Sequence, residues 1–162
     1  MAADMFLQLD GVPGESLDDK HKDWIEVLSY SHEVTQPTST TRSSAGGGST
    51  GRSEHGDFQL TKYIDKASPK LMELCATGKH ISKAKIEMCR AGGSQLPYMV
   101  VNMEEIIISS VQHGSDSGKD LPTEGLTLNY GKIEWTYTQQ KRKDGSGGGN
   151  VTAKYDVTAG KA

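Results

Sequence analysis

The chain has 162 residues, a length that fits one domain built around one hydrophobic core. Its 18 basic and 21 acidic residues give a formal net charge of −3, so no overall basic field exists to attract nucleic acid or an anionic membrane surface. No apolar stretch approaches the roughly 20 residues needed to cross a bilayer. We therefore predict a single domain over residues 1–162, with no nucleic-acid partner and no membrane insertion.

The N-terminal residues predict a short strand and no leader. Met5–Leu9 reads as a strand that ends at the turn-prone pair Asp10-Gly11. Asp4 stands where a signal peptide would carry basic residues, and the apolar run is too short for such a peptide. We expect synthesis in the cytoplasm and export, if any, without a cleaved signal peptide.

A second strand is predicted over Trp24–Val34, which is rich in β-branched and aromatic residues. In its second half, apolar residues alternate with small or polar ones, so one face should turn to the core and the other away from it. The apolar face would hold Leu28, Tyr30 and Val34, and the polar face Ser29, Ser31 and Glu33.

Residues 35–57 contain no large apolar side chain and are rich in Gly, Ser and Thr. Such a segment cannot bury enough surface to fold by itself. Long loops in compact domains are either functional or disordered, so two interpretations stay open. The segment is an unstructured insertion, which composition favours, or an arm that orders only against another subunit.

Part of this loop, Gly46–Ser53, matches a phosphate-binding loop except that Arg52 replaces the required lysine. A working loop needs a buried strand before it and a helix N-terminus facing the phosphates. Here a polar run precedes the glycines and a predicted strand follows them. A nucleotide hydrolase is therefore disfavoured.

One helix is predicted near Pro69–Thr77, after a strand over Phe58–Tyr63. Ser68 is a suitable N-cap, and Gly78 stands where a left-handed residue ends a helix. The helical stripe that should face the core consists of Leu71, Leu74 and Cys75.

The second half of the chain predicts strands in quick succession. They cover Ile81–Arg90, Tyr98–Met103, Ile106–Gln112, Leu126–Tyr130, Ile133–Thr138 and Val151–Val157. Residues 144–162 read as a flexible Gly/Ser-rich loop plus a C-terminal strand or tail. Many short strands at near-regular spacing predict a mainly β fold: a compact antiparallel β-barrel made of two sheets with one short helix packed on it.

The sequence contains no recognisable catalytic, metal-binding or redox motif. The five histidines are scattered, and Cys75 and Cys89 lie too far apart in sequence for a redox pair or half of a zinc site. Asp18-Asp19 and Glu104-Glu105 read as solvated turns, and no Gly-x-Ser-x-Gly elbow is present. The Lys141–Lys143 run reads as a solvated strand end. We predict no catalytic residue, no cofactor and no metal, and hence no enzyme.

Taken in order, many short pieces resemble the haemolysin-coregulated protein (Hcp) family, the tube protein of type VI secretion systems. The resemblance spans about Met1–Lys143. It is carried by the pieces Met5–Leu7, Gly14–Ser16, His21, Ile25–Ser31, Thr61–Leu71, Thr77–Ile81, Lys83–Lys85, Arg90–Gly93, Ile106–Val111 and Leu128–Ile133.

The resemblance implies a structural role and no chemistry. It implies hexameric rings that stack into the inner tube of a contractile machine, whose sheath and baseplate proteins expel the tube with a spike protein of the VgrG type. It also implies that the channel carries or chaperones effector proteins, and that the chain is secreted through the apparatus.

The resemblance further implies candidate surfaces. An extended loop contacts neighbouring subunits, which gives the contact candidates Gln36, Thr38, Arg42, Arg52, Glu54 and His55. The strand holding Ser29 and Ser31 is similar to a channel-lining segment.

The alternative is a monomeric β-barrel that binds oligosaccharide or nucleic acid through an aromatic face. That alternative needs Trp24, Trp135 and several tyrosines exposed together, whereas their alternation with polar residues turns most of them toward the core.

Overall fold

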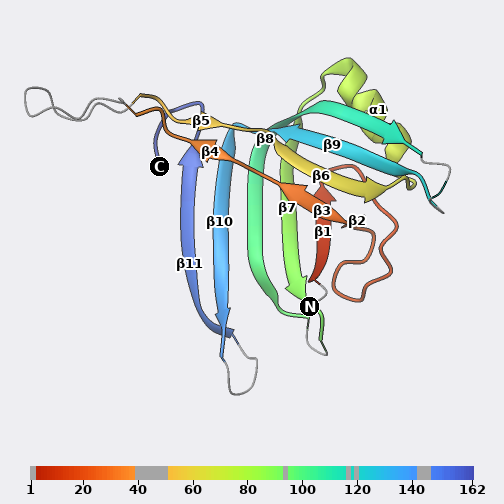
Figure 1. The fold of residues 1–162 in the computed structure, drawn as a ribbon, viewed down its shortest axis with the longest axis horizontal. Coiled ribbons are helices and arrows are strands. Elements are labelled where there is room, and N and C mark those ends of the chain that lie inside the picture. The colour runs from red at the N-terminus through yellow and green to blue at the C-terminus, as the bar shows by residue number, and fades with distance from the viewer. Residues whose placement is uncertain (1–2, 39–50, 93–94, 116–117, 119–120, 142–146) are drawn as a thin grey trace, which may run out of the picture.

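The structure, a computed structural model, describes residues 3–38, 51–92, 95–115, 118, 121–141 and 147–162 (Figure 1). These residues form antiparallel sheets and one short helix, as the sequence predicts. In chain order the elements are β1 Ala3–Leu9, β2 Ile25–Val27, β3 Ser29–Ser31, β4 Val34–Thr35, β5 Glu54–His55, β6 Phe58–Tyr63, α1 Ser68–Thr77, β7 Ile81–Arg90, β8 Pro97–Gly114, β9 Thr123–Asn129, β10 Lys132–Gln140 and β11 Gly147–Asp156.

The long strand β8 belongs to both sheets. Its N-terminal part, residues 97–106, pairs with β7 on one edge and with β10 on the other. Its C-terminal part, residues 107–114, pairs with β9. Lys132 lies opposite Glu104 and Asn129 opposite Ile107, so β9 and β10 follow one another along the same edge of β8. One sheet therefore continues through β10 to β11, and the other through β9 to β6 and β3.

The prediction of two strands in place of β8 is wrong because the chain bends there without leaving the sheet. Glu105 has a φ of 55° at the bend. Gly131 lies against it and donates its backbone N–H to the carbonyl oxygens of Glu104 and Glu105, at 3.0 and 3.1 Å. A Cβ on residue 131 would come within 2.5 Å of the Glu105 carboxylate, so glycine permits this close approach. Glu104-Glu105 is thus inside a strand and not in a solvated turn.

The segment Ile25–Ser31 closes the barrel between the two sheets. Its first half, β2, pairs with β1, and its second half, β3, pairs with β6. Between them, the Leu28 N–H donates to the Thr61 carbonyl oxygen at 2.8 Å. The predicted single strand Trp24–Val34 is therefore wrong, because the chain changes its pairing partner at this corner.

The predicted apolar face of that strand is wrong for the same reason. Leu28 and Tyr30 are 45% and 44% exposed, and Val34 is exposed as well. Tyr30 instead lays its ring over the buried Phe58, with the ring centroids 5.6 Å apart. Alternation predicts the buried face of a strand only while the strand stays in one sheet.

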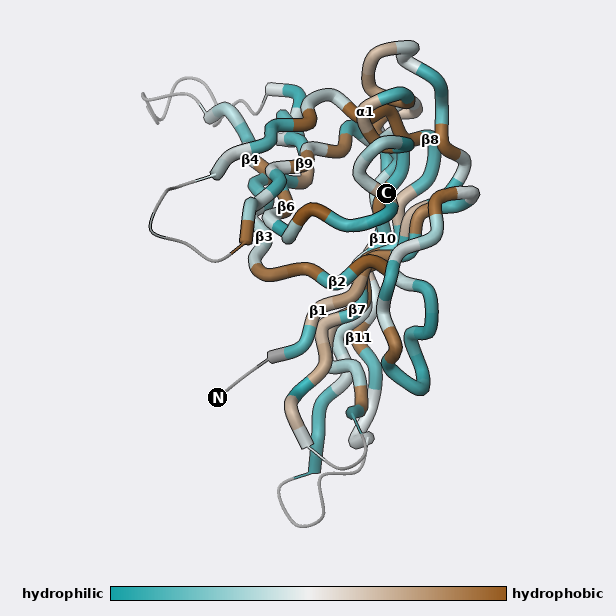
Figure 2. The backbone as a smooth tube through the Cα atoms, turned by 90° about the vertical axis from the view of Figure 1, so that its right-hand side faces the viewer, coloured by the Kyte–Doolittle hydropathy of each residue, from teal (hydrophilic) through white to brown (hydrophobic). Residues whose placement is uncertain are grey.

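The core is filled by alternate residues of the long strands and by one face of the helix. Its fully buried members include Leu7, Ile25, Phe58, Leu71, Ile86, Met103, Ile106 and Leu128. In Figure 2 hydrophobic stretches lie near β2 and α1, whereas the lower ends of the strands are mostly hydrophilic.

Helix α1 packs against β8 and matches the prediction except at its start. Leu71 and Leu74 are buried, Cys75 is half-buried, and Gly78 ends the helix with a φ of 64°. The cap residue is Ala67 and makes no side-chain cap bond, so Ser68 is not the N-cap. The described part of the chain holds no helix of the length and apolarity needed to span a membrane.

A buried ion pair lies beneath the start of this helix. Lys62 on β6 and Glu124 on β9 are both fully buried, with Nζ 2.9 Å from Oε1. The Lys62 ammonium also donates to Asp65 at 3.0 Å and to the Tyr63 carbonyl oxygen at 2.9 Å. Ser68 lies 3.4 Å from the same Nζ, and its hydroxyl oxygen accepts the Asp65 N–H. The hydroxyl is thus committed to this cluster, which is why it does not cap the helix.

Candidate subunit-contact and channel surfaces

Strands β4 and β5 form a two-stranded hairpin base that projects from the barrel. Val34 pairs with His55 and Thr35 with Glu54. Backbone bonds extend the pairing in both directions: Gly51 N–H donates to Pro37 at 3.0 Å, and Gly56 N–H to Glu33 at 2.9 Å. Figure 1 shows the pair leaving the body across the upper ends of β10 and β11. The described ends of the 35–57 loop are thus an ordered arm base.

Tyr130, buried in the barrel, joins this arm base to the body. Its hydroxyl lies 2.7 Å from Nε2 of His32 and 2.9 Å from Nδ1 of His55. Since one hydroxyl has one proton to donate, one ring nitrogen accepts that proton and the other donates its own. His32 also stacks on Phe58, and His55 on Tyr155, with centroids 5.1 and 4.9 Å apart.

These three side chains are held in their neutral forms. Burial, and then the charge of the neighbouring His55, lower the pKa of His32. Burial also lowers the pKa of His55 and raises that of Tyr130. The arm base is therefore anchored by hydrogen bonds between uncharged groups. The sequence does not reveal this anchor, because His32, His55 and Tyr130 are far apart in the chain and share no recognisable spacing.

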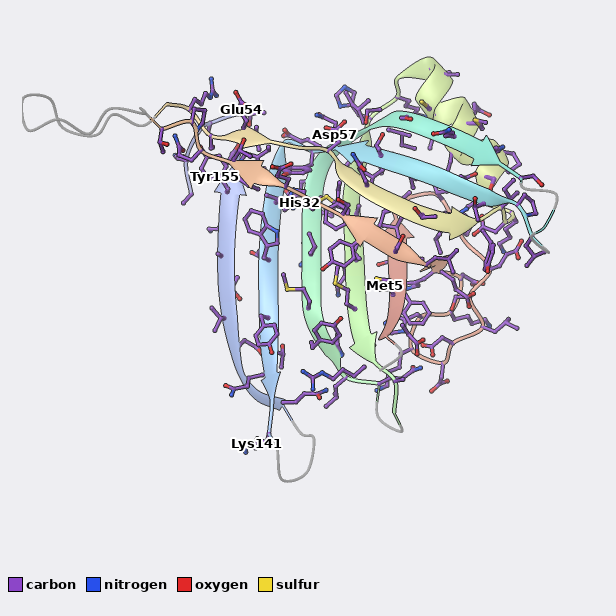
Figure 3. All side chains as sticks on the ribbon, in the orientation of Figure 1. Met5, His32, Glu54, Asp57, Lys141 and Tyr155 are labelled. Carbon is purple, nitrogen blue, oxygen red and sulfur yellow. The ribbon has the colours of Figure 1, made fainter. Side chains whose placement is uncertain are left out.

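Most of the candidate contact residues lie on the exposed arm base. Gln36, Thr38, Arg52 and Glu54 are exposed, while His55 is half-buried against Tyr130. The Gln36 side chain donates to the Gly51 carbonyl oxygen, and Arg52 donates to that of Val157 at 3.4 Å. Figure 3 places Glu54 and Tyr155 together at this base, with His32 nearer the barrel. Arg42 lies outside the described residues.

A hollow of about 450 Å³ separates the arm base from the last two strands. Gln36, Arg52, His55, Trp135 and Tyr155 line it. Its walls thus combine three contact candidates, Gln36, Arg52 and His55, with the half-buried rings of Trp135 and Tyr155.

Strand β3 presents the two channel candidates to solvent. Ser29 and Ser31 are both exposed, and so is Tyr30 between them. Within the described chain β3 pairs with β6 alone, so it borders the second sheet. The strand offers small hydroxyl groups on an open surface.

Strand β11 is an open edge of the first sheet. It pairs with β10 from Asp156 back to Gly147, and no strand of the described chain lies beyond it. Residues Gly147–Lys154 are exposed throughout, and Val151 is 72% exposed. This strand starts earlier than the predicted Val151. An unpaired edge of this length is a template for pairing with another chain.

The tyrosines and tryptophans are divided between the core and the surface, whereas the sequence predicts most of them in the core; Tyr98, Trp135 and Tyr155 pack against it. Tyr30, Tyr63 and Tyr137 are exposed, and Tyr130 alone of the tyrosines is buried. Trp24 and Trp135 are half-buried. Tyr30 lies on the edge strand β3, Tyr63 is the last residue of β6, and Tyr137 is the last residue of β10 that pairs with β8. Alternation decides burial less strictly at such positions.

Two of the other histidines have partners that spacing did not reveal. His21 is buried between Asp18 and Glu87. His113 places Nε2 2.6 Å from Glu124. Both cysteines are free. Cys89, on β7, is buried beside His21, and Cys75, on α1, is half-buried.

Comparison with known proteins gives one consistent result. A family model described as "Type VI secretion system effector, Hcp" matches residues 6–137. The chain is 38% identical over 158 residues to "Protein hcp1" of Pseudomonas aeruginosa, covering 97% of this chain and 96% of that protein. It is 30% identical over 132 residues to the "Major exported protein" of the same organism, covering 76% and 74%. The crystal structure of Hcp1 from Salmonella typhimurium superposes with a TM-score of 0.82 at 36% identity, covering 99% of both chains.

Proposed function

Because this chain belongs to the Hcp family of type VI secretion system proteins, we propose that it forms the hexameric rings that stack into the expelled inner tube. The family is one of structural secretion proteins and not of enzymes. The function of the chain is then self-assembly, and its functional surfaces are those through which one copy contacts the next.

The observation that carries this proposal is the open edge of β11 beside the projecting arm base. An exposed strand edge in a soluble protein invites pairing with another chain unless it is protected. Here the edge is long and glycine-rich, and the arm base lies next to its upper end. A second copy placed against this edge would cover it and meet the exposed Gln36, Arg52 and Glu54.

A ring needs two different surfaces on each subunit, because each copy contacts its neighbours head to tail. The β11 edge with the arm base supplies one surface, and the neighbouring copy meets it with a different part of the barrel. The number six is carried over from the family. Stacking repeats along the ring axis, and a sheath and baseplate that hold rings together would strengthen weak ring-to-ring contacts through effective concentration.

The exposed β3 hydroxyls supply the channel part of the proposal. Ser29 and Ser31 are small and uncharged, so a wall built of them leaves room for effector proteins and donates or accepts single hydrogen bonds. The further partners follow from the role: a spike protein of the VgrG type at the tip and contractile sheath and baseplate proteins around the tube. The chain would be cytoplasmic before assembly and then leave the cell through the apparatus.

Substitution of Val151 by Asp tests the edge. The carboxylate would lose its water at a subunit contact, so we expect Val151→Asp to shift the protein from rings toward monomers at equal concentration. Mass photometry measures the distribution. The matched control is Met72→Asp, which places the same charge on an exposed apolar residue of α1. Wild-type protein that is only monomeric contradicts the ring, and a Val151→Asp protein with undiminished rings contradicts the role of β11.

A further inference from the structure

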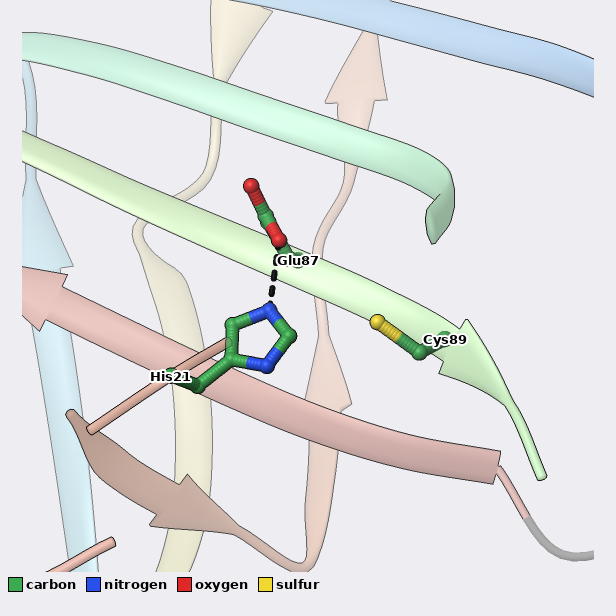
Figure 4. A group of neighbouring side chains, drawn as sticks. All are labelled: His21, Glu87 and Cys89. Atoms are coloured by element: carbon green, nitrogen blue, oxygen red, sulfur yellow. Dashed lines mark hydrogen bonds and ion pairs between the residues drawn. The ribbon is translucent and has the colours of Figure 1, made fainter. Parts of the chain in front are cut away.

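His21, Glu87 and Cys89 bring three different metal-binding groups together in a place where sequence spacing shows none. Glu87 and Cys89 are two residues apart on β7, so they share one face of the strand. His21, from the loop before β2, lies over them (Figure 4). One ligand atom of each residue lies within 4.8 Å of the others. This cluster is separate from the arm base and from β3.

The imidazole of His21 is fixed so that its Nε2 faces the other two groups. Nδ1 lies 2.7 Å from Oδ1 of Asp18. That carboxylate also accepts the backbone N–H groups of Lys20 and His21. A carboxylate oxygen accepts and does not donate, so the hydrogen bond to it places a proton on Nδ1. Phe6 stacks on the ring at 4.1 Å, and Trp24 meets its edge at 4.8 Å.

This is the arrangement that metal-binding histidines use, in which the second ring nitrogen is held by a carboxylate. His21 is 1% exposed, so solvent does not supply the partner of Nε2. That partner is Oε2 of Glu87, at 2.6 Å. The other carboxylate oxygen of Glu87, Oε1, forms an ion pair with Lys85 Nζ at 3.1 Å, which leaves Oε2 directed into the cluster.

The charge of the ligand set also suits a divalent cation. A metal-bound thiol is deprotonated, and a metal-bound carboxylate is ionised. A divalent cation held by Cys89 and Glu87 would therefore face one thiolate and one carboxylate, so the charges cancel.

We propose that His21 Nε2, a Glu87 carboxylate oxygen and Cys89 Sγ bind one divalent transition-metal ion, Zn²⁺ above all. Nitrogen, oxygen and sulfur together suit this borderline-soft ion, whereas Ca²⁺ and Mg²⁺ take oxygen ligands. Tetrahedral bonds of about 2.0–2.3 Å place two ligands ~3.5 Å apart. Side-chain rotation must therefore open the 2.6 Å contact of Nε2 with Oε2 and shorten the longer spacings, which reach at most 4.8 Å. Water completes the fourth position. The bound ion would cross-link the loop before β2, through His21, to strand β7, through Glu87 and Cys89.

Cobalt(II) is the probe, because a cobalt–thiolate bond absorbs in the near ultraviolet. The full-length protein is stripped with a chelator and titrated with Co²⁺. We expect one equivalent to bind with a thiolate band that Zn²⁺ abolishes on addition. Cys89→Ser should remove the band, whereas Cys75→Ser, which changes the other cysteine of the chain, should keep it.

Asp18→Asn tests the positioning of His21. It removes the charge that holds Nδ1–H and should weaken Co²⁺ binding by about 10- to 100-fold with the thiolate band retained. Circular dichroism of each variant establishes that it is folded. Folded wild-type protein that gives no thiolate band overturns the proposal even if a variant fails to fold. A band that survives in Cys89→Ser overturns it as well.

Discussion

Tyr130 shows how much one side chain can contribute to the position of a segment far away in sequence. Its hydroxyl bonds His32 on one side and His55 on the other, so it holds both strands that lead into the arm. Each imidazole is stacked on a further aromatic ring. The arm base keeps its place through this cluster and through its own backbone pairing, and not through a large apolar contact.

The cluster makes stability depend on pH. His32 and His55 have folded-state pKa values below the ordinary 6.5, so between the two values the unfolded chain binds more protons than the folded one. Their contribution to the free energy of unfolding is fully present above pH 6.5 and is lost as pH falls through the folded values. We expect urea denaturation to show lower stability at about pH 5 than at about pH 7.5.

The double variant His32→Gln/His55→Gln is the control for this dependence. It removes both titrating rings and leaves His21 and His113 in place, so the loss of stability on acidification should become smaller. An equal loss in the double variant and in the wild type would assign the effect to other groups.

At the scale of the elements, the sequence predicts best where a strand or helix keeps one environment along its length. Phe58–Tyr63 and Ile81–Arg90 match β6 and β7 at both ends, and α1 and its closing Gly78 are placed within a residue. Errors arise where the environment changes within an element. The chain over Trp24–Val34 changes partners at Leu28, and β8 bends at Glu105 while staying paired.

Buried charge is a second feature that residue patterns do not reveal. Lys62 lies on the same face of β6 as the buried Phe58 and Leu60, but a lysine is ordinarily exposed. Nothing in the sequence identifies Glu124 as its fully buried partner under α1. Burial raises the pKa of Glu124, but hydrogen bonds led by that from Lys62 outweigh it, and the net shift is downward. The carboxylate is thus ionised and matched to the ammonium.

Removing one member of this pair should be costly. Glu124→Ala leaves the Lys62 ammonium buried with Asp65 as its remaining carboxylate, so we expect unfolding to become easier by about 3–5 kcal/mol. Urea denaturation measures the change. Glu73→Ala is the matched control, since it breaks the exposed pair with Lys70 and should cost about 0–1 kcal/mol. Equal losses in the two variants would mean that the buried pair contributes no more than a surface one.

Strand β3 carries the channel hypothesis and can be tested alone. Ser31→Arg introduces a long cation at an exposed position, so backbone pairing with β6 should persist while the passage narrows. We expect rings to form normally and to retain fewer effector proteins through purification, as quantified by mass spectrometry of the proteins that co-elute. Ala76→Arg, on the exposed side of α1, is the control and should retain the wild-type amount. Equal retention of effector proteins by the Ser31→Arg and Ala76→Arg variants would contradict the hypothesis that β3 lines the channel.

At the scale of the whole molecule, the family follows from many short pieces in one order, and the comparisons confirm it. The overall position of the arm also follows from sequence, because a long polar segment interrupts the strands. What holds the arm and what lies at the edges depends on contacts between segments that are distant in the chain. The anchor at Tyr130, the cluster of His21 with Glu87 and Cys89, and the open edge of β11 are all of this kind.

The arrangement of the two sheets explains why the molecule is suited to assembly. Two sheets share β8 and close through Ile25–Ser31, so the barrel is internally complete. Outside this closed part, β10 and β11 extend the first sheet and end in an open edge, while the arm base projects beside them. A monomer thus leaves backbone groups of β11 to water, and a ring would pair or cover them.

Electron microscopy of the purified full-length protein tests the proposed ring most directly. We expect uniform particles with six subunits around an open centre, and end-to-end stacks of such rings at higher protein concentration. A homogeneous field of single-subunit particles at the same concentrations, from protein that circular dichroism shows to be folded, would contradict it.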